Sequence, residues 1–245
     1  MFNFFKKKEK VTLPYRTDVH SHILPGVDHG AYSIDNALEL IKIQMDMGIN
    51  RFVLTPHITK STFENTPEVI KEAFDLFKAE VEKVGLDIEL AVSAEYRLDE
   101  FSLAQFKNDQ FLLFPKKYIL LENAYQQERL DLDEILFEMQ IKSILPIMAH
   151  PERYSYYNNK KDRYIQMHSS GALFQVNLLS FAGYFGKAPR QNAEWLLEHN
   201  FIDMLGSDIH HREHARTLQE YMQTKDFKKI MERLEGRLIN DSIWE

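Results

Sequence analysis

The feature that most constrains the fold of this chain is a regular alternation of short apolar stretches with amphipathic helical stretches. Each apolar stretch ends on a histidine, carboxylate or amide side chain, and successive ends lie 27 to 38 residues apart, about the length of one strand and one helix. This alternation is typical of parallel β/α architecture. The seven end residues are His20, His57, Glu95, Glu122, His150, Asn177 and Asp208.

The placement of these polar residues favours a closed sheet over an open one. In a closed parallel barrel the carboxyl ends of the strands meet on one rim, where sites are built from several strands. An open doubly wound sheet would spread the same residues along a line. We therefore expect a single α/β domain, a seven-stranded (β/α)7 barrel, over residues 17–245, preceded by a basic and aromatic N-terminal extension over residues 1–16.

The composition excludes several kinds of chemistry. The chain of 245 residues contains no cysteine, so it has no disulfide framework, thiolate metal site or cysteine nucleophile. This absence is compatible with the reducing cytoplasm, where we expect the protein. The formal net charge of -7 argues against nucleic acid as a partner, because nucleic-acid binders usually carry a basic face.

The first ten residues, MFNFFKKKEK, combine three phenylalanines with four lysines. The apolar part is too short for a signal peptide or a membrane span. At most, residues 1–10 are expected to make a peripheral membrane contact or to dock on a membrane-bound partner. A solvated terminus without a partner is the alternative.

The stretch from Asp18 to Gly30 contains the densest group of candidate ligands. In an extended segment, side chains two residues apart point to the same side, so His20 and His22 would face one site. Two imidazoles with carboxylates close by are the ligands that first-row metals prefer. The alternative is a polar turn whose histidines bond to the backbone, but the polar ends of the other strands make it less attractive.

A rim that carries this many acceptors requires cations between them. Arg153 is the one obvious organic cation near the motifs, so divalent metal ions are the simplest source of positive charge. The number of candidate ligands predicts two to three ions. Nitrogen and oxygen ligands without sulfur suit manganese, iron or zinc.

Five segments carry a family resemblance: DVHSH (18–22), TPH (55–57), AE (94–95), IMAHPER (147–153) and GSDIH (206–210). Together they resemble the ordered motifs of the polymerase-and-histidinol-phosphatase (PHP) family, over about residues 17–218. Four further stretches make the chain most similar to the bacterial tyrosine-protein phosphatases of capsule and exopolysaccharide operons: HSHILPGVD (20–28), YILLE (118–122), AHPERY (149–154) and SFAGYFGK (180–187).

The resemblance implies a distorted seven-stranded barrel and a trinuclear metal centre, most often loaded with manganese. It also implies hydrolysis of phosphotyrosine on the tail of a membrane-bound tyrosine autokinase that controls capsule synthesis. The protein would then be cytoplasmic and recruited to the inner face of the membrane. The sequence leaves the oligomeric state open.

Matched position by position, the resemblance implies three overlapping sets of ligands and an arginine site for phosphate. One metal would be held by His20, His22, Glu95 and Asp208; a second by the bridging Glu95 with Glu122 and His150; and a third by His57, His210 and His29. Arg153 would bind phosphate, and Arg212 and Arg216 are both candidates for a second phosphate-binding arginine. Asp28 would assist catalysis or orient a ligand, while His211 and His214 are expected at the surface.

Position 29 departs from the pattern of the capsule-type phosphatases, which usually read Asp-Asp-Gly where this chain reads Asp28-His29-Gly30. We expect His29 to bind the third metal, because imidazole suits manganese, iron and zinc alike. The rival interpretation is that Asp28 is the ligand and His29 faces solvent.

Three functions fit these motifs. The first is the metal-dependent tyrosine-protein phosphatase. The second is a histidinol phosphatase or another phosphoesterase of the same scaffold, acting on a small molecule or on nucleic acid, although the acidic charge argues against a nuclease. The third is a binding module without activity, which the complete ligand set makes less attractive.

Overall fold

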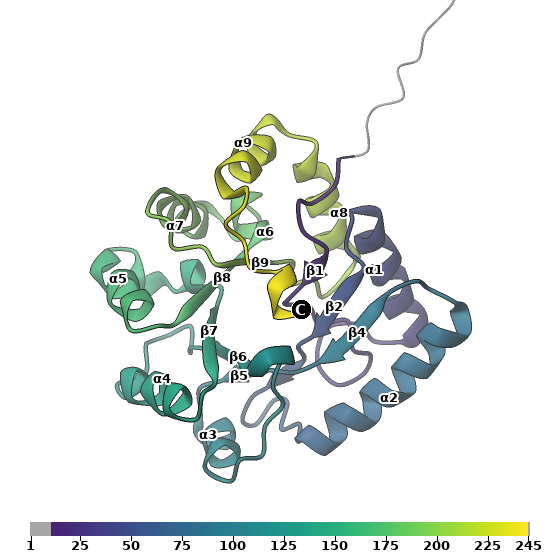
Figure 1. The fold of residues 1–245 in the computed structure, drawn as a ribbon, viewed down its shortest axis with the longest axis horizontal. Coiled ribbons are helices and arrows are strands. Elements are labelled where there is room, and N and C mark those ends of the chain that lie inside the picture. Colours follow the sequence, from purple (N-terminus) through teal and green to yellow (C-terminus); the bar gives the residue numbers. More distant parts are fainter. Residues whose placement is uncertain (1–10, 245) are drawn as a thin grey trace, which may run out of the picture.

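The computed structural model describes residues 11–244, so the phenylalanine- and lysine-rich residues 1–10 lie outside the described part of the chain. Strands lie at the centre of the molecule and helices surround them (Figure 1). The strands are β1 (Thr17–Asp18), β2 (Arg51–Leu54), β3 (His57–Ile58), β4 (Glu89–Val92), β5 (Glu95–Arg97), β6 (Tyr118–Glu122), β7 (Leu145–Ala149), β8 (Leu173–Asn177) and β9 (Met204–Gly206). The helices are α1 (Ile34–Asp46), α2 (Pro67–Val84), α3 (Glu100–Lys107), α4 (Leu132–Ile141), α5 (Lys161–Ser169), α6 (Leu178–Phe181), α7 (Lys187–Glu198), α8 (Arg212–Met222) and α9 (Lys225–Leu234).

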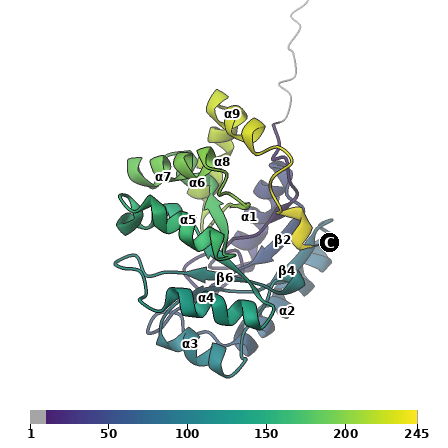
Figure 2. The same cartoon turned by 60° about the vertical axis from the view of Figure 1, so that its left-hand side comes forward.

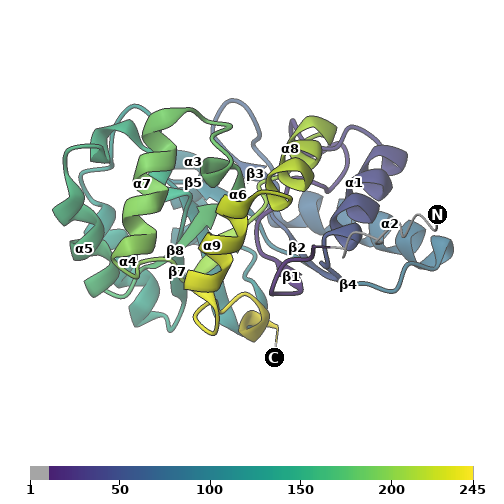
Figure 3. The ribbon, with the colours of Figure 1, turned by 90° about the horizontal axis from the view of Figure 1, so that it is seen from above.

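The strands form two parallel sheets, with orders β1-β2-β4 and β3-β5-β6-β7-β8-β9. Viewed from above, the smaller sheet lies with α1 and α2 at one side of the molecule, and β7 and β8 lie with α4, α5 and α7 at the other (Figure 3). Helices α7, α5, α4 and α3 follow one another along one flank (Figure 2). The expected α/β architecture with parallel strands is confirmed.

The single closed seven-stranded barrel is not confirmed. Two expected strands are each interrupted, between β2 and β3 and between β4 and β5, and the pieces belong to different sheets. The first and last strands nevertheless meet beyond their ends. The backbone nitrogen of Asp208 donates to the carbonyl of His20 at 2.8 Å, that of His22 donates to Ile209 at 2.9 Å, and Ser21 and Ile209 form a parallel bridge.

Local sequence determines where the longer helices begin and end. The side chain of Thr66 accepts a hydrogen bond from the backbone of Val69 at the start of α2, and Pro67 occupies the first turn, where it loses no helical hydrogen bond. The helix ends at Gly85, whose φ of 74° lies in the left-handed region that glycine adopts without strain. None of the helices within residues 11–244 is long and apolar enough to cross a membrane.

The hydrophobic core begins before the expected domain boundary at residue 17. Leu13 and Tyr15 are buried in the main core cluster, and the backbone nitrogen of Leu13 donates to the carbonyl of Met47 at 2.8 Å. Part of the expected N-terminal extension is therefore packed into the core of the α/β domain. The boundary itself stays a prediction.

Candidate metal centre

The polar residues at the carboxyl ends of the strands surround a cavity of about 190 Å³. The order of the parallel strands explains this arrangement, because their carboxyl ends point to the same side of each sheet. The described lining residues are His29, His57, Glu95, Arg97, Glu122, Tyr125, His150, Arg153, Asp208 and His210. His20 and His22, immediately after β1, are fully buried behind this lining.

Four overlapping groups of donor atoms lie close enough together to hold a metal ion, with all atoms of a group within 4.8 Å of one another. The groups are His22, His57 and His210; His20, His22 and Asp208; His20, Glu95 and His150; and His57, Glu95 and Glu122. Eight of the nine predicted ligands therefore converge. The ninth, His29, belongs to none of these groups.

Glu95 occupies the centre of this arrangement. Its Oε2 lies 3.1 Å from Nδ1 of His57 and 3.3 Å from Nε2 of both His20 and His22. Its Oε1 lies 2.9 Å from Nε2 of His150. Histidine nitrogens thus lie close to both carboxylate oxygens, an arrangement that is compatible with the predicted bridging role of Glu95.

Several donor atoms at the centre have no hydrogen-bond partner among residues 11–244, although they are buried. They include Nδ1 of His57, Oε2 of Glu95 and Oδ1 of Asp208. A buried polar atom without a partner is destabilising by about 1–3 kcal/mol, and by more when it is charged. Converging, unsatisfied nitrogen and carboxylate oxygen atoms are the environment in which a divalent cation is stable, so the residues present fit a metal centre.

Neighbouring side chains hold the first two histidines in one orientation. Nδ1 of His20 lies 2.6 Å from Oε1 of Gln175, and Nδ1 of His22 lies 2.7 Å from Oδ2 of Asp28. The Nε2 atoms, which lie 3.2 Å apart, are left for ligation. Metal-binding histidines usually have such a partner on the other ring nitrogen, which fixes the tautomer and the ring orientation. This contact supports the predicted role of Asp28 in orienting a metal ligand, here His22.

The ionisation of the cluster follows from burial and from mutual charge. Burial lowers the pKa of His57 to about 3 and that of His150 to about 4, so both imidazoles are neutral, as ligation requires. Burial also opposes the charged form of His20, but the carboxylates of Glu95 and Asp208 raise its pKa to about 9. Burial, together with the charge of Glu95, raises the pKa of Glu122 to about 7. A proton on His20 adds a positive charge and a proton on Glu122 removes a negative one, and the binding of divalent ions to these residues would displace both protons.

Two of the candidate ligands lie in unusual backbone conformations. His150 has a φ of 33° and Asp208 a φ of 50°. A residue other than glycine in the left-handed region costs about 1–3 kcal/mol, and such residues cluster at functional sites. His150 comes directly after β7, and Asp208 lies two residues after β9.

His29 and Asp28 differ clearly in their surroundings. Both oxygens of Asp28 are occupied, since Oδ2 also accepts a hydrogen bond from the backbone of His57 at 3.0 Å and Oδ1 accepts one from Gly30 at 2.8 Å. The ring of His29 is exposed, and its centroid lies 4.6 Å from that of His210 and 4.9 Å from that of His57. His29 is thus at the edge of the cavity, beside the two histidines with which it is predicted to act.

Arg153 is the predicted phosphate-binding residue that the structure places in the cavity lining. Its Nη1 donates to Oδ2 of Asp208 at 2.8 Å, and its guanidinium carbon lies 4.0 Å from the ring centroid of Phe185. Arg212 and Arg216 lie elsewhere, on α8, with side chains 76% and 77% exposed and paired with Glu39 and Glu220. Neither is among the described residues of the cavity, so the geometry gives their predicted role no support.

The two remaining histidines of this region have different environments. His211 is exposed, as expected, but the prediction that His214 is a surface residue is wrong. His214 is buried because α8 turns it inward, where Nδ1 lies 3.2 Å from the carbonyl oxygen of Asp208 and the ring packs at 4.8 Å from that of Tyr184.

Three residues that contact the candidate ligands or line the cavity beside them were missed in the sequence: Gln175, Arg97 and Tyr125. Gln175 precedes Asn177 by two residues on β8, and Arg97 follows Glu95 by two residues on β5. The period of two that placed His20 and His22 together could therefore have identified both. No periodic signal identifies Tyr125, because it lies outside the helices and strands.

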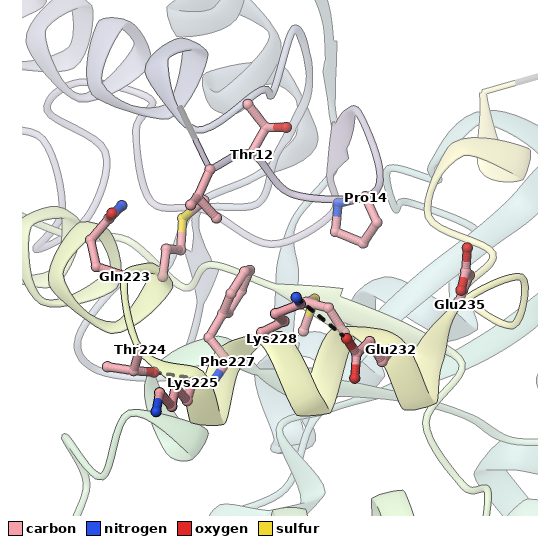
Figure 4. Close-up of a pocket in the computed structure, with 12 residues that line it drawn as sticks. Thr12, Pro14, Gln223, Thr224, Lys225, Phe227, Lys228, Glu232 and Glu235 are labelled. Carbon is pink, nitrogen blue, oxygen red and sulfur yellow. Dashed lines mark hydrogen bonds and ion pairs between the residues drawn. The ribbon is translucent and has the colours of Figure 1, made fainter. Parts of the chain in front are cut away.

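A larger hollow of about 580 Å³ lies away from these ligands, between the segment at residues 11–14 and helix α9 (Figure 4). Thr12 and Pro14 lie on one side of it, and Phe227 and Lys228 on the other (Figure 4). None of the described residues that line it is a predicted site residue. The predicted site residues that line a hollow are therefore at the smaller cavity.

Comparison with known proteins supports this assignment. The family model described as "Capsular polysaccharide synthesis, CpsB/CapC" matches residues 16–239. The tyrosine-protein phosphatase YwqE of Bacillus subtilis is 28% identical over 194 residues, which cover 79% of this chain and 76% of the relative. The tyrosine-protein phosphatase CpsB of Streptococcus pneumoniae is 30% identical over 204 residues, which cover 79% and 82%.

A solved structure shares the fold over most of both chains. It covers 91% of this chain and 94% of its own, with a TM-score of 0.74 and 26% sequence identity. It comes from work on YwqE from B. subtilis and CpsB from S. pneumoniae, which are described as unique metal-dependent tyrosine phosphatases.

Proposed function

Because the chain belongs to the CpsB/CapC family of capsular polysaccharide synthesis proteins, we propose that it is a metal-dependent phosphomonoesterase that dephosphorylates phosphotyrosine in proteins. The observation that carries the proposal is the convergence of four histidines on the two oxygens of Glu95, next to the guanidinium of Arg153. Without cysteine, the chain has no residue for the cysteinyl-phosphate route to the same product.

We assign two to three divalent ions to the centre, with manganese as the most suitable and iron or zinc as alternatives. The donor set supports this choice, since it consists of nitrogen and oxygen without sulfur. His20, His22, Glu95 and Asp208 would hold one ion; Glu95, Glu122 and His150 a second; and His29, His57 and His210 a third. When bound, such ions supply Lewis-acid polarisation of the phosphoryl oxygens and lower the pKa of a bound water towards ~7.

The residues of the chain then have separate tasks. Arg153 binds the non-bridging oxygens of the phosphoryl group, because Asp208 occupies one of its terminal nitrogens and the remaining donors are available to a ligand in the cavity. Gln175 and Asp28 keep His20 and His22 in the orientation that ligation requires. The leaving group is a tyrosine oxygen, whose ordinary pKa in water is ~10, so weak proton assistance suffices.

The substrate of this family suggests the physiological partner and the location. We propose the phosphotyrosine tail of a membrane-bound tyrosine kinase as the substrate, which places the protein in the cytoplasm at the inner face of the membrane. Residues 1–10, outside the described part of the chain, would make at most a peripheral membrane contact. Nucleic acid is not expected to bind, given the net charge of -7. An oligomer is compatible with this proposal.

We also propose that the two sheets together represent a distorted (β/α)7 barrel. The backbone contacts between residues 20–22 and 208–209 support closure between the first and last strands. The interruptions before His57 and Glu95 would provide the distortion, and both side chains line the cavity.

Metal-dependent hydrolysis of a phosphotyrosine peptide, measured beside histidinol phosphate and single-stranded DNA, tests the function. We expect the peptide to be the preferred substrate, with activity lost on chelation and restored by manganese. Full activity in protein verified to be free of metal would contradict the proposed chemistry. Preference for histidinol phosphate would assign the site to a small-molecule phosphatase instead.

A further inference from the structure

We infer that Arg97 is a second phosphoryl-binding residue of this site, acting beside Arg153. The inference rests on the proposed phosphatase function and adds to it a residue that binds the reacting group. Arg97 lies on β5, two residues after Glu95, and its side chain therefore emerges on the same side of the strand. It lines the cavity together with Glu95, Glu122 and Arg153.

The hydrogen bonding of Arg97 leaves most of its donors free. Its Nε donates to Oε2 of Glu122 at 2.7 Å, across the parallel pairing of β5 and β6. Neither terminal nitrogen of Arg97 makes a hydrogen bond to another residue within 11–244. A guanidinium has five N–H donors in a planar fork, so four donors remain on these two nitrogens. This fork matches the geometry of phosphate oxygens.

Arg97 and Arg153 are held in closely similar ways. One carboxylate of the candidate metal ligands binds each of them, Glu122 for Arg97 and Asp208 for Arg153. Both guanidinium carbons lie near the ring of Tyr125, at 5.4 Å for Arg97 and 5.2 Å for Arg153. Their side chains are 21% and 19% exposed. The ring and the carboxylates thus restrict two guanidiniums to one wall of the cavity.

The charge of the ligand favours this pair. A phosphate monoester carries about -1.5 to -2 charges near neutral pH, and it enters a cavity that already contains the carboxylates of Glu95, Glu122 and Asp208. The divalent ions proposed for the centre would offset these carboxylates, and the guanidiniums add N–H donors that can bind the non-bridging oxygens of the phosphoryl group. The hydrogen bond of Arg97 to Glu122 holds its side chain in place, which limits the entropy lost when phosphate binds.

The alternative is that Arg97 acts only on Glu122 and keeps that carboxylate charged and oriented for a metal. The two roles predict different effects when Arg97 is replaced. A residue that only positions Glu122 affects metal binding, whereas a residue that contacts the phosphoryl group affects the binding of phosphate even when the metal sites are full.

The decisive measurements are the inhibition constant of inorganic phosphate and the metal content of the manganese-loaded enzyme, in the wild type, Arg97→Lys and Arg97→Gln. Lysine keeps one charge and can still pair with Glu122, but it lacks the fork; glutamine keeps one hydrogen bond without the charge. Arg163→Lys is the matched control, because Arg163 on α5 is also largely buried and paired with carboxylates, including Asp133 at 2.7 Å, but does not line the cavity.

We expect both Arg97 variants to retain the metal content of the wild type and to raise the inhibition constant of phosphate by about 10- to 100-fold, the effect of losing one charge-assisted hydrogen bond. Arg163→Lys should leave this constant unchanged. The inference is overturned if the Arg97 variants keep their full metal content and phosphate inhibits them as strongly as the wild type. It is also overturned if phosphate inhibits them less strongly only because they have lost metal. If the wild type fails to hydrolyse phosphotyrosine peptides but binds phosphate through Arg97, the proposed substrate is wrong and this inference stands.

Discussion

Gln175 on β8 contacts His20 in the buried interior, with its Oε1 2.6 Å from Nδ1 of the imidazole. The amide nitrogen of the same glutamine donates to Oδ1 of Asn177 at 2.8 Å, which fixes the direction of the amide. Asn177 in turn donates to Oδ2 of Asp208 at 2.7 Å. A chain of amides on β8 therefore connects two candidate ligands that follow β1 and β9.

This relationship predicts that Gln175→Leu weakens metal binding without removing a ligand. Loss of the orienting partner should lower metal affinity about 10- to 100-fold, since His20 would no longer be held in one tautomer and one orientation. Competition with a chelator of known affinity measures the change. Gln44→Leu is a matched control, because Gln44 is also buried but its Nε2 has no hydrogen-bond partner among residues 11–244. Equal metal affinity in the two variants would show that Gln175 does not orient His20.

Much of the site could be predicted because its chemistry is concentrated at strand ends. Short apolar strands are visible in the sequence, and a polar residue that ends one is conspicuous, as with Glu122 after YILL. The supporting residues are harder to recognise. Gln175 lies inside β8, where a single polar residue is compatible with many structures, and Arg97 ends β5, a strand of only three residues in which no apolar run precedes it. Their partners come from other strands.

The fold was less predictable where long-range pairing decides the structure. The break between β2 and β3 spans two residues, and only the pairing of His57 with Glu95 and of Ile58 with Tyr96 assigns β3 to the larger sheet. Helix α3 lies in a region whose sequence is difficult to interpret, because two of its three buried residues, Ser102 and Gln105, are polar. The apolar stripe that identifies an amphipathic helix is therefore missing there.

Arg153→Ala should reduce turnover and leave the metal content unchanged, because the proposed partner of Arg153 is phosphate. We expect kcat/KM to fall about 10- to 100-fold, the value of one charge-assisted hydrogen bond. Arg153→Lys should recover little of this loss, since a point charge cannot replace a bidentate fork. Steady-state kinetics with an aryl phosphate and metal analysis of the same samples provide the test. If Arg153→Ala loses metal, Arg153 acts instead by holding the metal ligand Asp208 in position.

Gly206 is required by the close approach of two functional side chains. A Cβ atom at this position would lie 2.4 Å from Nε2 of Gln175 and 2.8 Å from Cβ of His20. Gly206→Ala should therefore displace both residues, lowering the free energy of unfolding by about 1–3 kcal/mol and weakening metal binding. Denaturant unfolding with and without manganese measures both effects.

The control is Gly85→Ala. Its new Cβ meets no atom within 4 Å, although a φ of 74° makes alanine unfavourable. The free energy of unfolding of Gly85→Ala should fall by about 1–2 kcal/mol, and its metal affinity should stay unchanged. If the metal affinity of Gly206→Ala is also unchanged, the prediction for Gly206 is wrong.

The assignment of the third metal to His29 gives the sharpest test of the site. Both oxygens of Asp28 already bind described groups, the ring of His22 and the backbones of His57 and Gly30, so Asp28 has little capacity for a metal. His29 has no such commitment, and its ring lies beside those of His57 and His210.

We therefore expect His29→Ala to lose one metal equivalent while the rest of the centre keeps its ions, because the other two ion sites do not use this residue. Asp28→Ala should instead weaken binding at His22 about 10- to 100-fold, the usual effect of losing an orienting carboxylate. Metal analysis after gel filtration, combined with anomalous scattering from crystals of both variants, distinguishes the two losses. His199→Ala is the control for removing an exposed imidazole, since His199 stacks on Trp195 at 4.0 Å and does not line the cavity. A third ion fully retained in His29→Ala and absent in Asp28→Ala would assign the ligand to Asp28.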